Sequence, residues 1–175
     1  MGVVKTRRFQ LHRFTYTVDL PVLFLFIGVF LDVVSTSLFV VLDAGREANV
    51  VLGNLISISV WFIPVYLLTS NAIFVPLLSD VLRKSLSYSF GVVHGLLALN
   101  NFSLILYNNA FVVDTLGYNT VIVLHFLFGI SMFVYFVREK KLNQKEIKST
   151  VLKLVLYLLF LGLIQAVYFA LPRIL

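Results

Sequence analysis

Residues 20–42 read LPVLFLFIGVFLDVVSTSLFVVL, an apolar run in which Asp32 is the single ionisable side chain. A helix that crosses a bilayer needs about 20 predominantly apolar residues, so this run predicts a transmembrane helix. A cleaved signal peptide is the main alternative interpretation. The run is longer than the usual signal-peptide core of about 7–15 residues, however, and no small-residue cleavage motif follows it. We therefore expect this helix to be retained.

The composition of the whole chain indicates the same class of protein. Of the 175 residues 60% are hydrophobic and 13% are charged, whereas a soluble domain has roughly 45–50% apolar and about 25% charged residues. Lipid is the environment in which so much apolar surface is stable. The chain has no cysteine, which excludes disulfides, thiolate catalysis and cysteine-based metal sites.

Further apolar runs follow the first at residues 55–78, 85–107, 120–137 and 151–171. The sequence thus predicts an all-α integral membrane bundle of five transmembrane helices, forming a single domain over residues 1–175. The run at 55–78 contains Pro64 and Pro76. A kink at Pro64 and a short surface or re-entrant segment both remain open for it.

The basic residues orient this bundle. All but two of the 14 Lys and Arg residues fall in the N-terminal tail and in the second and fourth loops or their borders. Because cytoplasmic loops are enriched in these cations, we expect the N-terminus inside the cell and the C-terminus outside. The net charge of +6 is thereby explained by membrane topology, and we expect no nucleic-acid partner. The predicted location is the cell membrane, with multiple passes.

The tail at residues 1–19 mixes aromatic and basic residues, which predicts a cytoplasmic segment at the membrane interface. We expect the tail and the fourth loop to contact anionic lipid headgroups. The residues assigned to these contacts are Arg7, Arg8, Arg13, Lys140 and Lys141.

Ionisable side chains at membrane depth are costly and therefore mark candidate functional positions. Asp32 and Thr36 share one face of the first predicted helix, and His94 and Asn101 share one face of the third, by helical spacing. His125 lies in the outer part of the fourth. The predicted polar cluster comprises Asp32, Thr36, Glu47, Asn49, His94, Asn101 and His125.

Part of this cluster resembles a known pattern. Asp32 to Thr36 reads D-x-x-x-T, and Glu47 to Asn49 reads E-x-N. This order resembles the first hairpin of small uncharacterised prokaryotic multi-span membrane proteins. The resemblance covers only that hairpin, and it ends at Val50, where such proteins commonly have a proline. It implies a small helical membrane protein with these polar residues grouped, and it implies no activity.

Three functional interpretations follow from the cluster. The leading one is a protein that handles an ion or a small solute, or a subunit of a membrane complex with a protein partner or further copies of itself. The second is an intramembrane metal-dependent hydrolase, in which Asp32, His94 and His125 hold a divalent metal such as zinc and Glu47 assists. The third is a purely structural subunit whose polar side chains join helices. The sequence favours a non-enzymatic role.

Overall fold

A computed structural model describes residues 19–44 and 50–171 of the chain. All regular elements in this part of the chain are helical, which confirms the predicted all-α class. Their order is α1 (Leu20–Val41), α2 (Val50–Ile56), α3 (Phe62–Asn71), η1 (Val75–Leu77), α4 (Asp80–Tyr107), α5 (Phe111–Leu116), α6 (Tyr118–Glu139) and α7 (Gln144–Ala170).

Within residues 19–44 and 50–171, four helices are long and apolar enough to cross a membrane, namely α1, α4, α6 and α7. They correspond to four of the five predicted runs. Two of them begin earlier than hydropathy indicates, because their first turns are polar. In α7 the side chain of Asn143 accepts hydrogen bonds from the backbone of Lys145 and Glu146, and Glu146 bonds back to the Asn143 backbone. This capping box fixes the start of the helix among charged residues.

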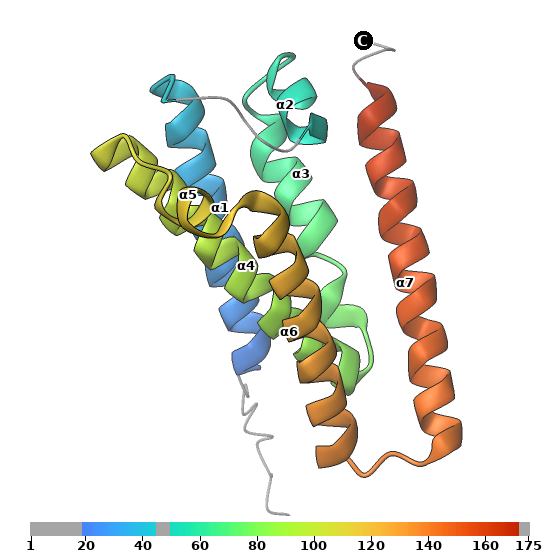
Figure 1. Cartoon of the computed structure of the whole chain (residues 1–175). Helices are drawn as coiled ribbons and strands as arrows, with labels where there is room; N and C mark the ends of the chain where they lie inside the picture. The colour runs from blue at the N-terminus through green and yellow to red at the C-terminus, as the bar shows by residue number, and fades with distance from the viewer. Residues whose placement is uncertain (1–18, 45–49, 172–175) are drawn as a thin grey trace, which may run out of the picture.

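The run at 55–78, expected to be irregular around its prolines, is not a single continuous helix. The segment contains the end of α2, the ten-residue α3 and the 3₁₀ turn η1, separated by turns. Pro64 lies in the first turn of α3, where a missing N–H breaks no helical hydrogen bond, so it does not kink the helix. Pro76 lies in η1. In Figure 1 these short pieces bring the chain back from the end of α1 to the start of α4.

The most extensive contact between described helices joins α1 to α4. A Cβ atom added at Gly28 would lie 2.6 Å from the carbonyl oxygen of Gly91, so only glycine allows the two backbones to approach this closely. Helix α3 packs against α1, and α6 packs against α4. Leu25 and Val29 of α1 are fully buried in a core shared with Ile63 and Val75. The crossing therefore sets the register in which the polar residues of α1 and α4 meet.

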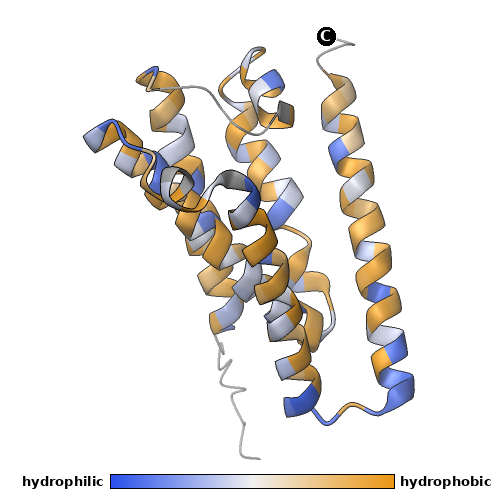
Figure 2. Ribbon diagram, in the orientation of Figure 1, coloured by the Kyte–Doolittle hydropathy of each residue, from blue (hydrophilic) through white to orange (hydrophobic). Residues whose placement is uncertain are grey.

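Helix α7 joins the bundle through α2, α3 and the turn after α3, with a smaller contact to α4. Tyr66 donates a hydrogen bond to Gln165 (2.7 Å), and the Phe74 ring meets the Phe160 ring edge-on at 4.9 Å. Most of the remaining surface of α7 is apolar and exposed. Figure 2 shows this apolar colour along α6 and α7, with hydrophilic residues gathered where α6 ends and α7 begins. Such a surface is stable only against lipid or a protein partner.

Candidate intramembrane polar site

The centre of the site is a carboxyl–imidazole pair between α1 and α4. The Nδ1 atom of His94 lies 2.6 Å from Oδ2 of Asp32, and the two residues are 5% and 3% exposed. At a rise of about 1.5 Å per residue, Asp32 lies roughly 18 Å along α1, near its middle. His94 lies near the middle of α4. The predicted convergence of these two residues therefore occurs near the middle of both helices.

Hydroxyl and amide groups extend the pair in one direction. Thr36 donates a hydrogen bond to the second carboxyl oxygen, Oδ1 of Asp32 (3.1 Å). The side-chain amide of Asn101 donates to the Thr36 hydroxyl (3.0 Å) and to the Ser35 hydroxyl (3.3 Å), and Ser35 donates to the Asp32 backbone carbonyl (3.1 Å). The result is a connected row of polar groups in which the donors point toward Asp32. It runs toward the C-terminal ends of α1 and α4.

Helix geometry explains why these residues meet. Asp32, Ser35 and Thr36 occupy one face of α1 at i, i+3 and i+4, and His94 and Asn101 occupy one face of α4 at i and i+7. Gly28 lies one turn before Asp32, and Gly91 nearly one turn before His94. Because these glycines are in backbone contact, the turns that follow them remain close enough for direct hydrogen bonds.

His125 has a different partner from the one predicted. Its Nδ1 atom lies 3.1 Å from the Ser89 hydroxyl of α4, and its ring stacks on Phe90 with centroids 5.4 Å apart. It also lines an apolar pocket of about 240 Å³ between α4, α5 and α6. The structure thus holds His125 against another part of α4, apart from the hydrogen-bonded row around Asp32.

The metal hypothesis required Asp32, His94 and His125 as one ligand set. Within residues 19–44 and 50–171, no group of three or more His, Cys, Asp and Glu side chains is arranged to hold a metal ion. Asp32 and His94 contact each other, and His125 is bonded to Ser89. The structure therefore does not bring Asp32, His94 and His125 together as one set of metal ligands.

Several predicted residues fall outside the described part of the chain. These are Glu47 and Asn49 of the candidate cluster, and Arg7, Arg8 and Arg13 of the lipid-contact set. Lys140 and Lys141 are described, and both are exposed at the end of α6. Lys140 forms an ion pair with Asp80 (3.0 Å).

Two hydroxyl residues were not among the predicted cluster. Ser35 was detectable in the sequence, because it lies three residues after Asp32 on the same helical face. Ser89 carries no such signal. Its bond to His125 depends on how α6 packs against α4, where a Cβ atom added at Gly129 would lie 3.0 Å from the Ser89 hydroxyl.

The resemblance of the first hairpin to small prokaryotic membrane proteins stays a prediction. Comparisons with protein-family models, with curated proteins and with solved structures gave no significant match to this chain.

Proposed function

We propose that this protein is a multi-pass cell-membrane protein that moves an ion or a small solute in exchange or together with protons at the Asp32–His94 pair. One observation carries the proposal, which is the 2.6 Å contact between two ionisable side chains that are almost completely buried at mid-helix. Ordinary packing between membrane helices is achieved by neutral groups. An ionisable pair at this depth is expected to take part in the transfer of protons or ions across the membrane.

The charge of the pair explains how coupling works. With one shared proton, carboxyl and imidazole together carry no net charge. With two protons the pair is positive, and with none it is negative. A charge at the centre of a membrane helix costs about 2.5–3.5 kcal/mol or more. The pair therefore gains a second proton most readily when an anion is bound beside it. It loses its shared proton most readily when a cation is bound there. Proton number is thereby linked to the charge of the solute.

The row of polar groups supplies access from one side. Thr36 and Asn101 continue from the pair toward the C-terminal ends of α1 and α4. On the opposite side of the pair lie the glycine crossing and the apolar side chains Leu25 and Val29. The distribution of basic residues favours an outward position for the polar side. In this topology the broken segment 50–78 forms the second of five crossings, and the start of α1 faces the cytoplasm.

Proton flux into liposomes tests the proposal. Purified protein is reconstituted with a pH-sensitive dye inside, and gradients of Na⁺, K⁺, Mg²⁺, chloride and acetate are imposed one at a time. We expect at least one gradient to change the internal pH. Asp32→Asn and His94→Gln should each reduce that rate at least about tenfold, because a transfer group then has a fixed charge.

A matched variant controls for folding and leakage. Ser131→Ala removes a hydroxyl of α6 that bonds only to the Leu127 carbonyl among the described contacts, and it should keep the wild-type rate. Circular dichroism and size-exclusion profiles establish that each variant is folded. A wild-type protein that responds to no gradient, or a response that Asp32→Asn retains, contradicts the proposal and favours a purely structural subunit.

A further inference from the structure

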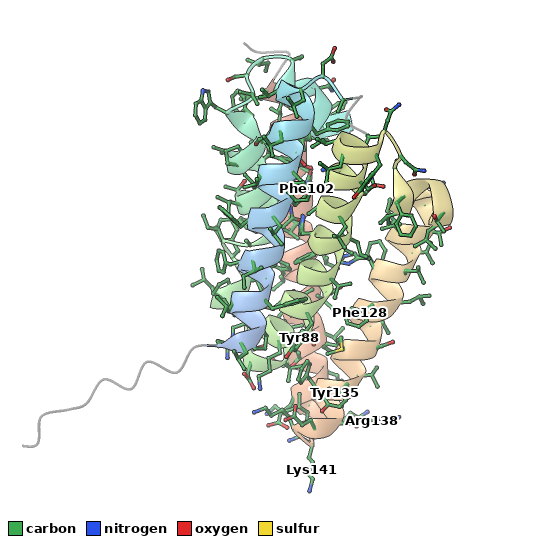
Figure 3. All side chains as sticks on the ribbon, turned by 90° about the vertical axis from the view of Figure 1, so that its left-hand side faces the viewer. Tyr88, Phe102, Phe128, Tyr135, Arg138 and Lys141 are labelled. Carbon is green, nitrogen blue, oxygen red and sulfur yellow. The ribbon has the colours of Figure 1, made fainter. Side chains whose placement is uncertain are left out.

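A second site lies at the end of the bundle where α1 begins. A pocket of about 480 Å³ is lined by Leu20 and Pro21 of α1, Lys84 and Tyr88 of α4, and residues of the last two turns of α6 that include Tyr135 and Glu139. Figure 3 shows Tyr135 beside Arg138 near this end of the molecule, with Lys141 beyond them and Tyr88 further up the bundle. Tyrosine together with basic residues is typical of the level of lipid headgroups.

A network of ion pairs lies beside the pocket. Asp80 is shared by Arg83 (2.8 Å), Lys84 (3.5 Å) and Lys140 (3.0 Å), and Arg83 also binds Asp19 (2.6 Å). In this network three cations therefore share two carboxylates. The hydrogen bond to the Asp80 side chain raises the pKa of Lys140 above its ordinary value, so this residue remains cationic. Lys84 has the longest of these contacts with Asp80 (3.5 Å) and is the cation that lines the pocket, so it is the one placed to contact an anionic group there.

Aromatic rings hold Lys84 in this position. Its ammonium group lies 5.6 Å from the centroid of the Phe136 ring, a cation–π distance. The ring of Tyr88 stacks on the same Phe136 ring, with the two centroids 6.1 Å apart and the planes at 7° to each other. Tyr135 meets Phe136 edge-on at 5.1 Å. Because the three rings pack against one another and Lys84 lies over one of them, the position of its ammonium group in the pocket is fixed by these contacts.

The lining of the pocket also includes a carboxylate. Glu139 lies at the end of α6 and lines the same pocket, while Leu20 and Pro21 provide apolar surface beside it. We propose that this pocket binds the headgroup of an ethanolamine phospholipid, with the phosphate at Lys84, the ammonium at Glu139 and the acyl chains along the apolar side of α1 and α6. A primary ammonium donates hydrogen bonds to a carboxylate, which the trimethylammonium of choline cannot do. This inference rests on membrane residence and is independent of proton coupling at Asp32.

Lipid binding to the whole chain tests this assignment. Delipidated protein in detergent is titrated with ethanolamine, choline and glycerol phospholipids that have identical acyl chains, and bound lipid is measured by native mass spectrometry. We expect the ethanolamine lipid to bind about tenfold more tightly than the other two, as one charge-assisted hydrogen bond allows. Lys84→Gln should weaken all three lipids. Glu139→Gln should remove the preference for ethanolamine over choline.

Two control variants match these changes in charge at other places. Lys148→Gln removes an exposed cation from α7, and Asp43→Asn removes an exposed carboxylate at the far end of α1. Both should leave the preference unchanged. Equal binding of the three lipids contradicts the proposal. Tighter binding of the glycerol lipid, increased further by Glu139→Gln, would instead assign an anionic-lipid site and would also overturn it.

Discussion

Replacing Gly28 with alanine tests the helix crossing on which the candidate site depends. The added Cβ atom would lie 2.6 Å from the Gly91 carbonyl oxygen, whereas ordinary contact begins at 3.4 Å. The helices must therefore separate locally by about 0.8 Å, the difference between these two distances. The obstacle is backbone, which cannot rotate away as a flexible side chain can. Overpacking of this kind costs about 1–3 kcal/mol.

Gly95 provides the matched control. It lies on α4, one turn beyond Gly91, and a Cβ atom added there meets nothing within 4 Å. Alanine is the better helix former, so Gly95→Ala should stabilise the protein by about 0.5–1 kcal/mol. The two variants add the same methyl group inside a helix, so the gain in helix propensity cancels and we expect their free energies of unfolding to differ by the overpacking cost, about 1–3 kcal/mol.

The assay is reversible unfolding in mixed micelles, in which SDS is titrated into a mild detergent and helix content is followed by circular dichroism. Gly28→Ala should shift the midpoint to lower SDS and Gly95→Ala to equal or higher SDS. A separation at Gly28 should also lengthen the Asp32–His94 contact one turn away, so Gly28→Ala should reduce proton flux. Equal stability of the two variants would refute the close crossing as described here.

Three further changes can be measured in the same titration. Ser87 is fully buried and its hydroxyl has no hydrogen-bond partner among the described residues, so Ser87→Ala should stabilise the protein by about 1 kcal/mol. The control Ser85→Ala removes a hydrogen bond to the backbone of its own helix and should change the stability little. A destabilised Ser87→Ala variant would argue against an unsatisfied hydroxyl. Gln165→Leu removes the acceptor of the Tyr66 hydroxyl and should cost about 0.6 kcal/mol, the average for such bonds in membrane proteins; an unchanged midpoint would contradict this estimate. Asn143→Ala removes the capping box of α7 and should cost about 1 kcal/mol, whereas Asn143→Asp should retain most of the stability.

Hydropathy was sufficient to predict the long helices, because a membrane-spanning helix must be apolar along its length. It was insufficient at residues 55–78, where the composition is equally apolar but the backbone turns between α2, α3 and η1. Hydropathy measures the free energy of placing side chains in lipid, and it carries no information about where the backbone turns. The proline positions signalled that this segment was irregular without showing where its helices would end.

The candidate site divides in the same way. The grouping of Asp32 with Thr36 follows from the helical period alone. The pairing of Asp32 with His94 joins residues 62 positions apart, and it was predictable only as the cheapest way to bury two ionisable groups. The position of His125 was not predictable, because it depends on which face of α6 meets α4. Gly129 faces Ser89 where the two helices meet.

The attachment of α7 through α3 has a consequence for the order of assembly during synthesis. Tyr66 and Gln165 are 99 residues apart, so most of the protein has been made before the acceptor for Tyr66 leaves the ribosome. Until then α3, too short to cross a bilayer alone, has Tyr66 and Thr69 without their α7 partners. Helix α7 therefore completes a segment that was made much earlier, and a chain cut short before α7 leaves the side chains of α3 that bind it without these contacts.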